Sequence, residues 1–247
     1  MLLTIDIGNT TTVFGVFDHE KLKKKWNIET LKLEGENPDS RLRLKTNSPV
    51  IVSSVVPSKD KIIKKIFPHA YFVTAENIKG IEVRAKKSEV GADRVINALA
   101  AKELYGSPAI VVDFGTATTF DVVSANGEYL GGAISPGIGL SSEILHQATA
   151  KLPVIQIKAP KYLIGKNTKD AIRSGLVYGY VSMVEGMVNK LKSKIPIKRK
   201  KIKVIATGGF AKLIAKYTES INIVDPNLTL LGLRLAHEKQ QEFQLNA

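Results

Sequence analysis

The stretch "TIDIGNTTTVFGVFD" at residues 4–18 has a close counterpart in "VVDFGTATTFDVVSA" at residues 111–125. Each copy is a short apolar strand that ends in Asp-x-Gly, continues through small hydroxyl residues and enters a second apolar run. The same kind of turn, with one carboxylate, one glycine and several threonines, therefore occurs twice. Similar segments that open two parts of one chain indicate an internal duplication.

The residues after each copy favour a duplicated α/β unit. In the first half we expect strands at 2–6, 13–18, 24–30, 49–56 and 70–74, and helices at 38–45, 59–67 and 91–106. In the second half we expect strands at 109–115, 118–124, 129–135 and 203–209, and helices at 138–150, 168–193 and 208–217. Apolar residues recur at the helical period in the helices, and strands that alternate with helices are typical of α/β folds.

The boundary between the halves is predicted at 106–108, where Gly-Ser-Pro interrupts regular structure. This gives an N-terminal lobe of residues 1–107 and a C-terminal lobe of residues 108–247, facing each other across a cleft. The last helix is free to pack back on the first lobe.

Composition excludes several classes of protein. The chain has 247 residues, 44% of them hydrophobic, which is enough to bury a core. Its start lacks the basic region of a signal peptide, and no apolar run approaches the roughly 18 residues of a membrane span, so we expect a cytoplasmic protein without a membrane partner. Cysteine is absent, which excludes disulfides and cysteine-based zinc sites.

The formal net charge of +13 could attract nucleic acid or an anionic substrate. The lysine runs at 21–25 and 198–201 lack interleaved aromatic residues, and no DNA- or RNA-binding module is recognisable. Solvated surface is therefore the favoured interpretation, and no nucleic-acid partner is expected.

The two turns suit phosphate and a cation. Glycine lets the backbone approach a ligand closely, and exposed N–H groups and threonine hydroxyls can donate to phosphate oxygens. The carboxylate of Asp6 could hold Mg²⁺ through water. The alternative is that Gly8 and Asn9 simply form a hairpin turn, as such residues often do. The P-loop pattern is missing, and "GIGLSS" at 137–142 lacks the third glycine of a dinucleotide fingerprint.

With "ATGG" at 206–209, the paired turns resemble the acetate and sugar kinase, heat-shock ATPase and actin superfamily. Within it, an ordered set of motifs is similar to type III pantothenate kinases along nearly the whole chain. The motifs are "DIGNT" at 6, "SSVVP" at 53, "GADR" at 91, "DFGTATTFD" at 113, "GGAISPG" at 131, "LP" at 152, "GKNTKDAIRSG" at 165, "ATGG" at 206 and "DPNLTLLGL" at 225.

The resemblance implies two duplicated ribonuclease-H-like lobes with an ATP cleft between them. It also implies ATP-dependent phosphorylation of pantothenate, the first step of coenzyme A biosynthesis, by a homodimer whose substrate pocket forms at the subunit interface. The implied cofactors are ATP, Mg²⁺ and a monovalent cation, K⁺ or NH₄⁺. The predicted ATP contacts are Asp6, Ile7, Gly8, Asn9, Thr10, Thr11, Thr12, Val13 and Thr116.

Other roles carry over motif by motif. Asp93 matches the proton acceptor, although an aspartate is also favoured at the start of a helix. Gly91, Ala92, Asp93 and Arg94 would line pantothenate, and the guanidinium of Arg94 suits its carboxylate. Thr168 would contact pantothenate, or would merely cap its helix. Asp113 matches the ligand of the monovalent cation.

One departure concerns the acceptor. The family often has a tyrosine seven residues before the glycine of "GADR", where this chain has Arg84. Arg84 either reaches a carboxylate of the substrate or is solvated surface. Two rival functions stay open: a kinase of a related small acceptor, and a non-catalytic accessory or regulatory protein of the same fold. The presence of Asp6, Asp93 and Asp113 argues against the second.

Overall fold

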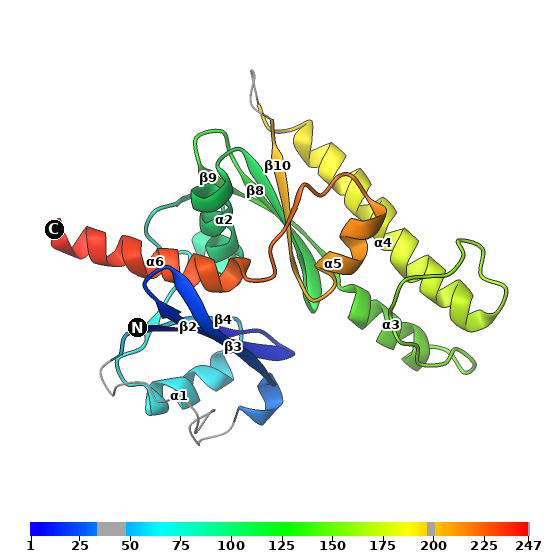
Figure 1. The fold of residues 1–247 in the computed structure, drawn as a ribbon, viewed down its shortest axis with the longest axis horizontal. Coiled ribbons are helices and arrows are strands. Elements are labelled where there is room, and N and C mark those ends of the chain that lie inside the picture. The colour runs from blue at the N-terminus through cyan, green and yellow to red at the C-terminus, as the bar shows by residue number, and fades with distance from the viewer. Residues whose placement is uncertain (34–47, 197–200, 247) are drawn as a thin grey trace. The chain divides into compact units, whose positions relative to one another are not determined.

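The computed structural model describes residues 1–33, 48–196 and 201–246, and the chain divides into two compact units. The first comprises Met1–Leu104 together with Asn227–Ala247, and the second comprises Tyr105–Pro226. Figure 1 shows the elements of both along the chain. The helix expected at 38–45 lies outside the described residues. The last helix, α6 (Leu228–Leu245), is grouped with the first unit, whereas the sequence-based division counted it in the second lobe.

The first unit is built on a five-stranded sheet in the order β3-β2-β1-β4-β5. The central strand β1 pairs antiparallel with β2 and parallel with β4. The elements of this unit before α6 are β1 (Leu2–Ile7), β2 (Thr11–Asp18), β3 (Lys21–Glu29), β4 (Val50–Ser54), α1 (Pro57–Ile66), β5 (Tyr71–Phe72), β6 (Glu82–Val83) and α2 (Ala92–Tyr105), with short 3-10 turns at Thr30–Lys32 and Lys87–Glu89.

The second unit repeats this plan, with strands in the order β9-β8-β7-β10-β11. Its central strand β7 pairs antiparallel with β8 and parallel with β10. The elements are β7 (Ala109–Phe114), β8 (Ala117–Val123), β9 (Glu128–Pro136), α3 (Ile138–Gln147), α4 (Thr168–Lys192), β10 (Lys203–Gly208), α5 (Ala211–Ile214), a 3-10 turn at Ala215–Tyr217 and β11 (Ile223–Val224). The matching pairing of the two sheets confirms the internal duplication.

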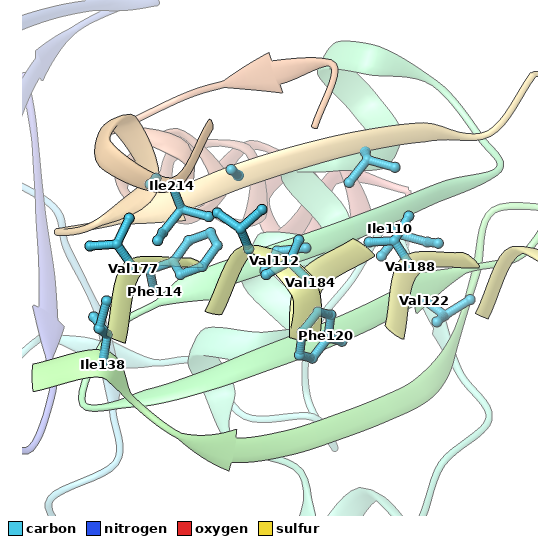
Figure 2. Packing of buried hydrophobic residues seen from close by; sticks show 14 of the residues in the cluster. Ile110, Val112, Phe114, Phe120, Val122, Ile138, Val177, Val184, Val188 and Ile214 are labelled. Atoms are coloured by element: carbon cyan, nitrogen blue, oxygen red, sulfur yellow. The ribbon is translucent and has the colours of Figure 1, made fainter. Parts of the chain in front are cut away.

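Successive residues of a strand point to opposite faces of the sheet, so the positions of the apolar residues show which face packs against a helix. In β7 the residues Ile110, Val112 and Phe114 point to one side and are buried against α4, as Figure 2 shows. Residues 109, 111 and 113 must then point to the other side. The carboxylate of Asp113 therefore lies on the face opposite α4.

The first sheet is covered in the same manner. Leu3, Ile5 and Ile7 of β1 lie in a core with Ile63 of α1. Helix α6 packs against β1, β2 and β4 (Figure 1). A Cβ atom at Gly15 of β2 would lie 3.0 Å from Cδ1 of Leu230, so α6 covers the face that also carries Asp6. The part of the chain described holds no helix with the length and low polarity needed to cross a bilayer.

Tyr105 and Asp225 connect the two ends of the second unit. The Tyr105 hydroxyl donates to Oδ2 of Asp225 at 2.8 Å. Burial, together with this carboxylate, raises the pKa of Tyr105 to about 12. The phenol thus stays protonated, and remains a donor, at any physiological pH.

Helices α2 and α6 approach closely at Gly232. A Cβ atom there would lie 2.5 Å from the carbonyl oxygen of Ile96. We expect Gly232→Ala to separate the helices and lower the free energy of unfolding by about 1–3 kcal/mol. Gly175→Ala on α4 is the control, because nothing lies within 4 Å of its Cβ position and helix propensity alone should stabilise it by up to about 1 kcal/mol.

Denaturant unfolding of both variants measures the difference. Equal stability of Gly232→Ala and the wild type would show that α2 and α6 do not pack as described.

Candidate functional site

The first Asp-x-Gly turn joins β1 to β2. The N–H of Gly8 donates to the carbonyl oxygen of Thr11 at 3.1 Å, so the turn is a hairpin as well as a candidate phosphate contact. The hydroxyl of Thr30 donates to the carbonyl oxygen of Gly8 at 2.7 Å and lies 3.0 Å from that of Thr12. Thr12 is fully buried, and its hydroxyl holds the turn in place.

The tip of this turn is exposed. Asn9 and Thr10 are open to solvent, whereas Asp6, Gly8 and Thr11 are partly buried. Of the predicted ATP contacts in this segment, Ile7 and Thr12 are buried in the unit. An anion can therefore reach the backbone and side chains around the tip of the turn. The Asp6 carboxylate lies at the base of the turn, where it could hold a cation.

The second turn, between β7 and β8, places its carboxylate in the equivalent position. Asp6 and Asp113 are each the fifth residue of a six-residue strand, and the two strands have the same order of buried and partly buried residues. The N–H of Gly115 donates to the carbonyl oxygen of Ala117 at 3.1 Å. Thr116 is exposed, and its carbonyl oxygen accepts from the N–H of Gly137 at 3.0 Å, which attaches the start of α3 to the turn.

The Gly-Gly turn after β10 lies directly beside the second Asp-x-Gly turn. Thr207 is the register partner of Asp113. Gly208 has φ of +88°, and a Cβ atom there would lie 2.6 Å from the carbonyl oxygen of Phe114 and 2.5 Å from Oδ1 of Asp113. Glycine is thus required at 208 both by its backbone conformation and by the closeness of the Asp113 carboxylate.

The "GADR" motif begins α2. Oδ1 of Asp93 accepts a hydrogen bond from the N–H of Arg94 at 2.9 Å, so the carboxylate has the position expected at a helix start. A Cβ atom at Gly91 would lie 2.5 Å from the same Oδ1. Both Asp93 and Arg94 remain partly accessible, which is compatible with a catalytic role for Asp93.

Val55 connects the first turn with the "GADR" motif within the first unit. Its N–H donates to the carbonyl oxygen of Ile7 at 3.0 Å, and its Cγ1 lies 3.4 Å from the Cβ position of Gly91. The residue of "SSVVP" that follows β4 is therefore in contact with both segments. The role of this motif could not be predicted from the sequence, because its position depends on the parallel pairing of β1 and β4.

Thr168 is the first residue of α4 and is exposed. The interpretation of Thr168 as a helix cap is wrong, because the capping residue is Asn167, whose Oδ1 accepts from the N–H of Asp170 at 3.0 Å. The side chain of Thr168 is thus not used for capping. A contact with pantothenate stays a prediction.

Arg84 is about half exposed and forms an ion pair with Glu82, with 3.0 Å between Nη1 and Oε1. An exposed pair of this kind contributes about 0–1 kcal/mol. Arg84 therefore engages a carboxylate of its own unit at the surface, which favours the interpretation of solvated surface.

The donor set for metals is sparse. Over the described ranges, no group of three or more His, Cys, Asp or Glu side chains could hold an ion. Asp6 and Asp113 are each the one carboxylate of their own Asp-x-Gly turn, beside threonine hydroxyl groups and backbone. This arrangement fits Mg²⁺, which usually keeps several waters and binds phosphate oxygens as well.

The chain is similar in sequence to a known family of enzymes along nearly its whole length. The family model described as type III pantothenate kinase matches residues 2–190. The type III pantothenate kinase of Geobacillus kaustophilus is 43% identical over 98% of this chain and 99% of its own.

Solved structures support the fold. A putative Baf family transcriptional activator from Campylobacter jejuni superposes with a TM-score of 0.65 at 21% identity over 97% of this chain and 99% of its own. MreB 5 of Spiroplasma citri superposes with a TM-score of 0.57 at 13% identity, covering 99% and 98%. These likenesses confirm the predicted fold of two ribonuclease-H-like units. Given its similarity in sequence along nearly its whole length, the chain belongs to the type III pantothenate kinase family.

Proposed function

We propose that this chain transfers the γ-phosphoryl group of ATP to the terminal hydroxyl of pantothenate, giving 4'-phosphopantothenate in the first step of coenzyme A biosynthesis. The observation that carries the proposal is membership of the family over nearly the full length, with Asp93 accessible at the start of α2. We place the reaction in the cytoplasm.

The chemistry asks the protein mainly for positioning and charge neutralisation. The hydroxyl oxygen of pantothenate bonds to the γ-phosphorus as the bond from that phosphorus to the bridging oxygen of ADP breaks. Asp93 accepts the hydroxyl proton. The N–H of Arg94 fixes one oxygen of that carboxylate and so orients the base. The side chain of Arg94 is assigned to the carboxylate of pantothenate, together with Gly91, Ala92 and Thr168 from the substrate motifs.

ATP is assigned to the Asp6 turn, with Thr116 as a further contact. When bound, Mg²⁺ neutralises phosphate charge. Asp6 would hold it through water, since one carboxylate is the only acidic side chain that this turn supplies. Asp113 is assigned to a monovalent cation, K⁺ or NH₄⁺. A carboxylate near a triphosphate would repel it, and a cation at Asp113 turns that repulsion into attraction.

A homodimer is part of the proposal. Large apolar side chains are exposed on α3 and on the segment that follows it in the second unit. They are Leu140, Ile144, Leu145, Val154, Tyr162, Leu163 and Ile164. Contiguous exposed apolar surface is typical of interaction sites, and we assign these side chains to one. A second copy of this chain is the proposed occupant, in line with the dimer that the family resemblance implies.

Asp93→Asn tests the base. We expect the variant to fold and bind ATP but to lose a factor of roughly 10²–10⁴ in kcat, the usual contribution of a positioned general base. Coupled ADP release with pantothenate as acceptor measures the rate, and circular dichroism checks the fold. Turnover near the wild-type rate would remove Asp93 from this role, and failure to fold would leave only its part in starting α2.

Arg94→Ala tests the substrate assignment. Removing the cationic partner of the pantothenate carboxylate should cost about 2–5 kcal/mol, seen mainly as a higher KM for pantothenate. Steady-state kinetics with each substrate varied in turn gives both KM values. The KM for ATP serves as the internal control, so similar increases for the two substrates would contradict the assignment.

Asp113→Asn tests the monovalent cation. We expect wild-type activity to require KCl or NH₄Cl, with poor replacement by NaCl, because Na⁺ is smaller and holds its water more tightly. The variant should lose this dependence along with most of the activity. ADP release in chloride salts at constant ionic strength is the measurement. Full wild-type activity with choline chloride alone would show that Asp113 serves Mg²⁺ or the fold.

A further inference from the structure

The two duplicated turns differ in the residues that lie opposite their carboxylates. In the antiparallel pair of β7 and β8, Asp113 lies opposite Thr119, and Val111 lies opposite Asp121. In the pair of β1 and β2, Asp6 lies opposite Val13, and Thr4 lies opposite Gly15. The second copy thus places a hydroxyl and a second carboxylate where the first has valine and glycine.

Asp121 is fully buried and both of its oxygens receive hydrogen bonds. The hydroxyl of Tyr129, also fully buried, donates to Oδ1 at 2.8 Å. The hydroxyl of Thr119 donates to Oδ2 at 2.9 Å. A buried carboxylate is costly unless it is well hydrogen-bonded, so Asp121 keeps both of these bonds. Its bond to Thr119 therefore holds the Thr119 hydroxyl in one orientation.

This orientation decides what Thr119 offers to Asp113. Directly opposed residues of an antiparallel pair have Cβ atoms about 4.5–5.5 Å apart, on the same face of the sheet. Thr119 has a single hydroxyl proton, and that proton points to Asp121. What Thr119 presents toward Asp113 is therefore oxygen lone pairs, which attract a cation held by that carboxylate.

We propose that Oγ1 of Thr119 is a second protein ligand of the monovalent cation at Asp113, and that Asp121 and Tyr129 are positioning residues that orient it. This inference rests on the proposed role of Asp113. Alkali cations are hard ions that take oxygen ligands, and the face beside Asp113 supplies them from a side chain whose geometry is fixed. The bond to the buried Asp121 also makes Oγ1 of Thr119 a stronger electron donor, as hydrogen-bonded neighbours of metal ligands do.

The surroundings of Asp6 in the first copy differ from those of Asp113, and this difference suits the two turns to different ions. The side chain of Val13 cannot ligate a cation, and Gly15 makes room for Leu230 of α6. The β2 residues opposite Asp6 and Thr4 thus add no side-chain oxygen beside Asp6, which suits Mg²⁺ with its waters. Asp113 with Thr119 can replace part of the hydration shell of a larger and less strongly hydrated ion.

The test compares Thr119→Val with Thr119→Ser. KCl is titrated against choline chloride at constant ionic strength, with ADP and Mg²⁺ present, and both the melting temperature and the initial rate of ADP release are followed. We expect Thr119→Val to raise the KCl concentration for half-maximal effect by roughly tenfold or more in both readouts. Substitutions around metal ligands typically weaken metal affinity by about this factor. Thr119→Ser keeps the oxygen and should remain close to the wild type.

Thr118→Val is the matched control. Thr118 is the neighbouring residue of β8, is fully buried, and points to the opposite face, and its hydroxyl has no hydrogen-bond partner among the residues that the structure describes. Its variant should keep the wild-type response to KCl. A role of Thr119 in the fold alone would lower the melting temperature equally in KCl and choline chloride.

The outcomes separate the two proposals. If the wild type itself does not respond to KCl, the cation role of Asp113 fails and the inference falls with it. If the wild type responds and Thr119→Val responds with the same half-maximal concentration, only the inference is overturned. Should Thr119→Val not fold, Thr119→Ala and Tyr129→Phe are titrated in its place, with a weaker response to KCl expected for each.

Discussion

The pairing of one central strand on both sides is the constraint on which the rest of the structure depends. In each unit this strand pairs antiparallel with the strand after it and parallel with a later one. The hairpin with β2 or β8 places the glycine turn at the end of the central strand. The parallel neighbour, β4 or β10, places a second chain segment at the same end. The carboxylate of Asp6 or Asp113, one residue before the strand ends, therefore lies where backbone from two further segments meets it. In the second unit the fit is so close that only glycine is accommodated at Gly208.

The two units share this strand arrangement but differ in the side chains beside the two carboxylates. Beside Asp6 the opposite strand offers Val13 and the face is covered by α6, whereas beside Asp113 it offers Thr119, supported by the buried Asp121 and Tyr129. A duplicated backbone thus carries two carboxylates in equivalent positions with different surroundings. This difference is the physical basis for proposing a hydrated divalent ion at the first turn and a monovalent ion at the second.

Much of the fold could be predicted from the sequence, because apolar runs with the period of a strand or helix correspond to elements that bury one face. Strand β7 and helix α2 were expected within one or two residues of their observed bounds. The two-residue strands β6 and β11 were not expected, since pairing with distant segments defines them and local residues do not. The cap at Asn167 was missed because either of two adjacent polar residues can cap a helix, and only the backbone decides between them. The network around Asp121 depends on strand register, which the sequence alone leaves open.

Identification of the reaction product tests the central claim most directly, which is that this member of the family phosphorylates pantothenate. The purified chain is incubated with ATP, Mg²⁺, KCl and pantothenate, and the mixture is followed by ³¹P NMR and mass spectrometry. The account predicts one new phosphomonoester on the terminal hydroxyl of pantothenate, formed in the same amount as ADP. ADP formation that does not depend on pantothenate, or a phosphate carried by no part of that molecule, would contradict it.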